Sequence, residues 1–274
     1  MQVEKSWATL VNMQDKPSIC LGIDSSRRYQ PFVYAALDME RQIIAIGSGP
    51  LTEVLAYCAG LANACLAINS PRYPNQGLVA AEEEKQTLFP VPASKRGDLR
   101  KVELGLLEEG IRVARTPASE KDCPVWMQRG FKLYERLQRL GYMPYPQVDP
   151  HIYLEVSAEA AFSRLAGGAP LFEDDTLEGR LQRQLVLYEN QLPVGDAMKF
   201  FEEVTRYRLM KGVLPMDGIY TSGELNALVC AFTAWLLFQE DGTAVCLGDQ
   251  REGEIYLPPL AADVFHPRRV YKAG

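Results

Sequence analysis

The chain has 274 residues, of which 47% are hydrophobic and 23% charged, a composition typical of a folded protein with a sizeable core. Its net charge of −6 and pI near 5.2 argue against a general nucleic-acid binder, which usually carries a basic excess. The first ten residues, MQVEKSWATL, lack the apolar core of a signal peptide, and no apolar run approaches the ~18 residues that cross a bilayer. We therefore expect a cytoplasmic protein with no membrane contact.

Cysteine and histidine give no sign of a zinc site. The chain has six cysteines and two histidines, no two cysteines are spaced as C-x-x-C, and most lie in apolar runs, so neither a zinc cluster nor a disulfide framework is expected. We predict free, mostly buried thiols at all six positions. These positions are Cys20, Cys58, Cys65, Cys123, Cys230 and Cys246.

The first third of the chain predicts three strands, a helix and a fourth strand. Residues 18–24, 32–38 and 42–48 are apolar runs separated by short polar turns, a spacing typical of consecutive antiparallel strands. Pro50 opens an amphipathic helix, and the apolar run 64–68 follows it. The alternation of strands and helices further along the chain predicts an α/β protein whose sheet has parallel members after an antiparallel start.

The middle of the chain, about 71–150, is an inserted loop and helical segment in a single domain that spans 1–274. Residues 71–94 contain four prolines and the acidic run EEE, which indicates a long loop. Helices are predicted at 97–110 and 125–141, because each is amphipathic and ends at a glycine, with a short strand at 111–115 between them.

The last third predicts one more core strand and several helices. The segment 151–157 has strand character, and the helix at 222–238 is the most apolar of the chain, which favours packing against the sheet. The remaining predicted elements are helices at 158–168, 175–190 and 196–211 and short strands at 244–249 and 254–258.

Polar side chains interrupt the apolar runs at positions where α/β proteins carry their sites. Asp24 and Asn69 end two strands, Glu155 lies within a third, and Asn226 lies in the first turns of the last helix; the carboxyl ends of parallel strands meet at one edge of a sheet. Carboxylate and amide oxygens are ligands for Mg²⁺ or Mn²⁺. Two carboxylates would neutralise two ions poorly, so we expect any such ion to bind weakly.

Each of these residues also has a purely structural interpretation. Asp24 could cap the turn after its strand, and Asn69-Ser70-Pro71 is ordinary turn chemistry. Glu155, amid apolar neighbours in IYLEVS, requires a partner if it is buried.

Arginine and lysine form two further candidate features. Arg129, Lys132 and Arg136 share one helical face that is either a solvated surface or a local basic face for nucleic acid. Arg180 and Arg183 are i, i+3 neighbours that either hold the anion of a substrate or pair with Glu155.

Several segments in a fixed order resemble the predicted nucleases of ribonuclease H-like fold known as domain of unknown function 429. The similarity covers roughly 18–257 and rests on these segments: GID (22–24), AINSPR (67–72), RKVELGLLEEGI (100–111), WMQRGFKLYERLQRLGY (126–142), EVSAEAAF (155–162), GRLQR (179–183) and LNALVCAFTA (225–234). The resemblance implies a mixed sheet of strand order 3-2-1-4-5 with strand 2 antiparallel and helices on both faces. It places Asp24 and Glu155 at acidic site positions, and Asn69 and Asn226 where aspartate is usual.

Two hypotheses follow from this combination of residues. The first is a metal-dependent nuclease with a reduced acidic site, either weakly active or inactive; the second is a non-catalytic binding or scaffold protein of the same fold, acting on a protein partner or as a homo-oligomer. An actin-like phosphotransferase also begins with a Gly-Ile-Asp strand, but it needs a glycine-bearing turn after the aspartate. GIDSSRRYQPF has none, so no nucleotide cofactor is expected.

Overall fold

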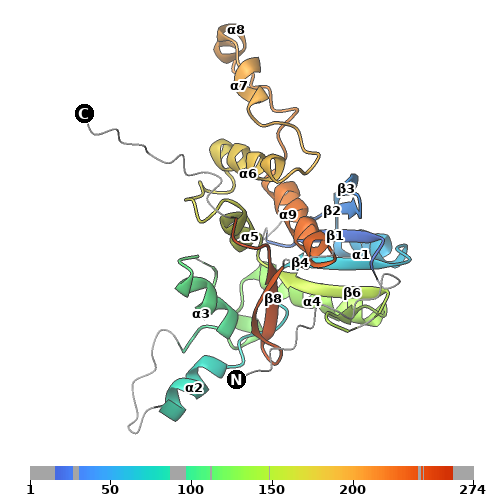
Figure 1. Ribbon diagram of the computed structural model, residues 1–274, viewed down its shortest axis with the longest axis vertical. Helices are drawn as coiled ribbons and strands as arrows, with labels where there is room; N and C mark the ends of the chain where they lie inside the picture. Colours follow the sequence, from blue (N-terminus) through green and yellow to red (C-terminus); the bar gives the residue numbers. More distant parts are fainter. Residues whose placement is uncertain are drawn as a thin grey trace, which may run out of the picture.

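A computed structural model describes residues 16–26, 31–86, 97–111, 113–147, 149–239, 242 and 244–261, with the side chains of 84–86 excepted. Within these residues, eight strands form one mixed sheet surrounded by helices (Figure 1). The predicted α/β class is therefore confirmed. The strands are β1 (Ile19–Asp24), β2 (Phe32–Asp38), β3 (Ile43–Gly49), β4 (Ala64–Asn69), β5 (Met143–Pro144), β6 (His151–Val156), β7 (Val245–Asp249) and β8 (Gly253–Leu257).

The strand order is β3-β2-β1-β4-β6-β8-β7, with β5 paired beside β6. Strand β2 is antiparallel to both β1 and β3, whereas β1, β4 and β6 run parallel to one another. The five longest strands are thus neighbours at one side of the sheet, and β1 lies inside it with partners on both edges. The carboxyl ends of β1, β4 and β6 consequently meet at one edge.

Helices cover both faces of the sheet. On one face, α9 and α5 pack over Cys20, Ala67 and Leu154 in the larger apolar cluster; on the other, α1 and α4 pack over Leu21 and Leu66. The longer helices are α1 (Leu51–Ala59), α2 (Leu78–Gln86), α3 (Lys101–Glu108), α4 (Val125–Arg139), α5 (Ala158–Leu165), α6 (Leu177–Glu189) and α9 (Ser222–Leu237). None of the helices in the described part of the chain is long and apolar enough to cross a bilayer.

Three predicted segments differ from the structure. Helix α2 lies inside the predicted loop 71–94, of which 87–94 fall outside the described residues. The predicted strand at 111–115 is irregular at 111 and 113–115, while Arg112 is not described. The predicted helix 196–211 is broken into α7 (Lys199–Glu203) and α8 (Arg206–Met210), because Val204 is extended and Thr205 caps a new helix by accepting from the Arg208 N–H.

The cysteines are all free, as predicted. Four are buried in the apolar clusters, where their thiols pack as small apolar groups. Cys123, buried in the segment before α4, donates its thiol to the Pro117 and Ser119 carbonyl oxygens. Cys246 in β7 is exposed, which departs from the expectation of mostly buried thiols only at that position.

Helix α9 touches β1 without any side chain between them. A Cβ atom placed on Gly22 would lie 1.8 Å from the Ala227 carbonyl oxygen and 2.6 Å from the Ala231 nitrogen. Ala227 and Ala231 are themselves fully buried, so the helix backbone rests on the strand backbone. This close approach fixes the depth at which the first turns of α9 meet the end of β1.

We predict that Gly22→Ala destabilises the protein by about 3 kcal/mol or more, since the added methyl group meets backbone atoms that cannot move independently. Gly105→Ala in α3 is the matched control. No neighbouring atom of the described residues lies within 4 Å of the point that a Cβ at Gly105 would occupy, and alanine in a helix should stabilise by up to about 1 kcal/mol. Chemical denaturation of both variants measures the difference. Equal stabilities would show that α9 does not lie on β1 in this way.

Candidate functional site

Asp24 and Asn69 face each other at the carboxyl ends of adjacent parallel strands. They are register partners in β1 and β4, and Asn69 Nδ2 donates to Asp24 Oδ1 over 2.7 Å. Asn69 Oδ1 accepts from the Ala158 N–H over 3.0 Å, which serves one of the unpaired donors at the start of α5. The two bonds fix the orientation of the amide, because the carboxylate needs a donor and the helix N–H needs an acceptor.

Asp24 is buried and enclosed by hydrogen-bond donors. Ser26 contributes its N–H at 3.2 Å and its hydroxyl at 3.0 Å, and Asn226 from α9 bonds the same carboxyl. Gly223 lies so close that a Cβ there would be 3.6 Å from Asp24 Oδ2, which places the positive end of the α9 dipole beside the carboxylate. Burial raises the pKa of Asp24 above its usual value, while the bonds from Asn69, Ser26 and Asn226 oppose that rise.

Glu155 does not join this cluster. In β6, the residue level with Asn69 is Val156, and Glu155 pairs one position earlier with Ile68. Since side chains alternate across a strand, Glu155 points to the opposite face of the sheet from Asp24 and Asn69. The structure therefore brings together Asp24, Asn69 and Asn226 of the four predicted ligands and separates the fourth.

Arg100 is the partner that buried Glu155 was expected to need. Its guanidinium donates to the two Glu155 oxygens over 2.6 and 3.2 Å, and its Nε donates to Glu103 over 3.1 Å. The Arg72 backbone N–H adds a further bond to Glu155 over 2.8 Å. The sequence contains the i, i+3 pair of Arg100 and Glu103, but the contact with Glu155 spans 55 residues and has no local signal.

The cluster of Arg100, Glu103 and Glu155 is almost completely buried. Arg100, Glu103 and Glu155 are each less than 5% exposed, and Glu103 also accepts from the Thr116 N–H and hydroxyl. Burial raises the pKa of Glu103, while Arg100 and Thr116 act in the opposite direction. For Arg100 burial lowers the pKa, but the attraction of Glu155 and Glu103 outweighs it and raises the value overall. The charged groups of Arg100, Glu103 and Glu155 are therefore paired with one another inside the protein.

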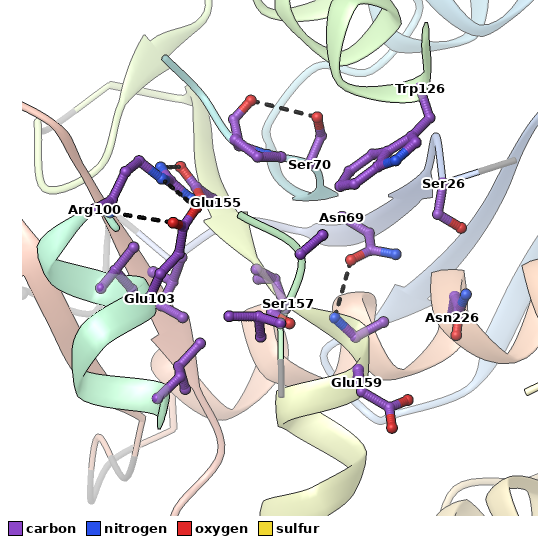
Figure 2. A pocket seen from close by; sticks show the side chains of 18 of the residues that line it. Ser26, Asn69, Ser70, Arg100, Glu103, Trp126, Glu155, Ser157, Glu159 and Asn226 are labelled. Carbon is purple, nitrogen blue, oxygen red and sulfur yellow. Dashed lines mark hydrogen bonds and ion pairs between the residues drawn. The ribbon is translucent and has the colours of Figure 1, made fainter. Parts of the chain in front are cut away.

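A cavity of about 280 Å³ lies between the two clusters. Figure 2 shows Asn69 and Asn226 at one end, the Arg100 and Glu155 pair at the other, and the Trp126 indole above Asn69. Glu159 and Asp174 also line the cavity. Its walls thus combine an aromatic ring, two amides and acidic side chains at the carboxyl edge of the sheet, where α/β folds usually bind their ligands.

Basic residues of α4 begin beside this cavity. The Arg129 guanidinium lies 4.3 Å above the Phe32 ring; burial lowers the pKa of Arg129, and the charge of nearby Asp24 acts against that shift. Lys132 and Arg136 continue the same helical face and are exposed. The face begins one turn after Trp126, the α4 residue that lines the cavity.

Arg180 and Arg183 are held by the protein itself. Arg180 donates to the backbone oxygens of Tyr220 and Ile219 over 2.7 and 3.0 Å. Arg183 is 1% exposed and donates to Phe172 O and to Glu159. The alternative in which Arg183 pairs with Glu155 is wrong, because its carboxylate partner is Glu159. Binding of a substrate anion by these two arginines stays a prediction.

The cluster around Asp24 does not have the donor set of a two-ion site. Within the described residues, no group of three or more His, Cys, Asp or Glu side chains lies together as metal ligands would. The Asn69 amide nitrogen points at Asp24, and an N–H group cannot ligate a cation. No reaction step through a bound ion follows from this arrangement.

Comparison with known protein families, with curated proteins and with solved structures finds no match for this chain. Its function is therefore argued from the site alone.

We predict that Asp24→Asn becomes more stable relative to the unmodified protein as the pH rises from about 4 to 8. The pKa of Asp24 is higher in the folded state than its ordinary value, so the folded chain binds the proton more tightly and loses stability when the carboxyl ionises. The variant has no proton to lose there. Urea unfolding of both proteins across this range measures the difference in unfolding free energy, variant minus unmodified protein. A difference that falls as the pH rises would contradict the raised pKa of Asp24.

Proposed function

We propose that the chain is a ribonuclease H-like protein in which the two-metal nuclease site has become a metal-independent binding site. The strand order β3-β2-β1-β4-β6 with β2 antiparallel supports the fold assignment, as does the gathering of Asp24, Asn69 and Asn226 at the edge that the resemblance designates. The bond from Asn69 Nδ2 to Asp24 Oδ1 is the observation that carries the proposal.

A cation between two carboxylates removes their mutual repulsion, and the Asn69 amide removes the same repulsion without a cation. With aspartate at 69, two like charges would face each other, and at an effective dielectric near 20 a unit pair at 4 Å repels by about 4 kcal/mol. The Asn69 amide removes one charge and supplies a donor to the other. Asp24 is thereby satisfied without a cation, and Glu155 is neutralised separately by Arg100.

Single-stranded nucleic acid is the ligand that we propose for this site. Trp126 at the cavity provides a flat surface on which a base can stack, and Arg129, Lys132 and Arg136 supply cations for the backbone along α4. The cavity is lined largely by apolar side chains and by the acidic residues Glu159, which pairs with Arg183, and Asp174, so the strand should follow α4 with only a base entering the cavity. Binding without cleavage is the expected outcome.

Restoring the carboxylates tests whether a metal-dependent nuclease site has been lost. We predict that Asn69→Asp with Asn226→Asp loses about 2–4 kcal/mol of stability in chelator, because like charges are buried together, and recovers part of it in magnesium, whereas the unmodified protein shows no magnesium effect. Thermal unfolding with and without Mg²⁺ measures this. The control Gln76→Glu with Gln147→Glu adds the same charge at exposed positions. Magnesium stabilisation of the unmodified protein, or cleavage of DNA or RNA that Asp24→Ala abolishes, would refute the proposal.

Fluorescence anisotropy with labelled single-stranded DNA and RNA tests the proposed ligand. We predict that Lys132→Glu with Arg136→Glu weakens binding at least tenfold and lowers its salt dependence, on the order of two phosphate contacts being lost. Trp126→Ala should weaken binding about tenfold with unchanged salt dependence, as expected for lost stacking. Lys121→Glu, an exposed change outside α4, is the control. Equal affinities in all four proteins would exclude this face.

A further inference from the structure

Helices α7 and α8 form an arm that leaves the body of the protein. Figure 1 shows them beyond α6, on the side away from the sheet. We use "the arm" for residues 198–214. Its base is attached to α6 through Phe200, which packs with Leu181 and Ala197 in a small separate apolar cluster.

The outer part of the arm is apolar and exposed. Of the fourteen exposed large apolar side chains in the described residues, seven lie in the arm. Met210 is 77% exposed and Tyr207 72%, and α8 has no buried residue at all. A five-residue helix gains little stability in isolation, and monomers rarely expose a concentrated apolar patch of this kind. The seven residues are Met198, Phe201, Tyr207, Leu209, Met210, Val213 and Leu214.

Charge along the arm is divided into two blocks. Glu202 and Glu203 form an acidic block in α7, and Arg206, Arg208 and Lys211 form a basic block in and after α8, while one further cation, Lys199, lies apart from both blocks at the base of the arm. Arg208 and Glu203 of the same arm approach to 3.3 Å, with side chains 45% and 59% exposed. An ion pair this exposed contributes little, so both blocks keep their capacity to interact with another surface.

We propose that the arm pairs with the arm of a second copy of this chain, antiparallel and about a two-fold axis. A two-fold interface requires a surface that is complementary to itself. Antiparallel pairing sets the acidic block of each arm against the basic block of the other, and it covers the apolar side chains of both. The seven side chains expose on the order of several hundred Å² of surface per arm, which approaches the ~800 Å² that each partner buries in a standard interface.

Charge disfavours the other occupants. Parallel pairing of two arms would oppose like blocks. An anionic membrane surface would attract Arg206, Arg208 and Lys211, but it would repel Glu202 and Glu203 beside them and the body of a chain whose net charge is −6. The second copy is the occupant that satisfies both blocks at once.

Sedimentation equilibrium of the full chain tests the apolar part of this interface. The unmodified protein should reach twice the 30.7 kDa of one chain, and Leu209→Gln with Met210→Gln should weaken the dimer at least about tenfold. Because no α8 residue is buried in the monomer, these changes should leave far-UV circular dichroism and the monomer fold intact. Leu107→Gln with Leu140→Gln, also exposed but outside the arm, should leave the dimer unchanged.

Charge reversal tests the antiparallel orientation. Glu202→Lys with Glu203→Lys makes the whole arm basic, and Arg206→Glu with Arg208→Glu makes most of it acidic, so each variant alone should dimerise at least about tenfold more weakly. An equimolar mixture of the two should recover dimerisation as a heterodimer. Glu40→Lys with Glu108→Lys, exposed positions outside the arm, carries the same charge change and should dimerise normally.

Several results would overturn the proposal. The unmodified chain could stay monomeric up to about 100 µM. The Leu209→Gln with Met210→Gln variant could dimerise as tightly as the unmodified chain. The mixture of the two charge variants could fail to associate. A monomer that cosediments with phosphatidylserine vesicles would assign the arm to a membrane surface instead.

Discussion

The contact between Gly22 and the backbone of α9 determines how closely the α9 residues of the Asp24 cluster approach that carboxylate. Because no side chain separates the strand from the helix at Ala227, α9 descends far enough for Gly223 and Asn226 to reach Asp24. A helix held away by one methyl group would leave the buried Asp24 carboxylate with fewer donors. The missing side chain at Gly22 thus lets α9 approach the sheet edge. The hydrogen bonds to Asp24 from α9 therefore depend on the apolar packing of Gly22 against Ala227 and Ala231.

Two polar clusters lie at the carboxyl edge of the sheet, one on each of its faces. The cluster of Asp24, Asn69 and Asn226 consists of one charge and several donors, and the cluster of Arg100, Glu103 and Glu155 consists of two carboxylates around one guanidinium. Each satisfies its own charges, which is the condition for burying polar groups at all. The Asp24, Glu103 and Glu155 carboxylates that border the cavity region are therefore already hydrogen-bonded or paired within the protein.

The sequence predicted the main strands, the meeting of Asp24 with Asn69, and the packing of the last long helix because each depends on local periodicity or on strand ends. It wrongly grouped Glu155 with Asp24 and Asn69. Side chains alternate along β6, so Glu155 shares a face with Tyr153, opposite to Leu154 and Val156. Arg100 could not be predicted as its partner, because that contact joins segments far apart in the chain. The break between α7 and α8 was missed because a Thr cap inside a polar helix leaves the overall periodicity intact.

The Asn69 amide also constrains the order in which substitutions at this edge can accumulate. Asn69 has two partners, the Asp24 carboxylate and the first N–H of α5, and an ionised aspartate can bond only the second. A change of residue 69 alone to aspartate would give a less stable protein, because the two carboxylates would then face each other without a donor between them. Substitutions elsewhere that come to depend on the Asn69 amide would therefore make its replacement by aspartate progressively harder.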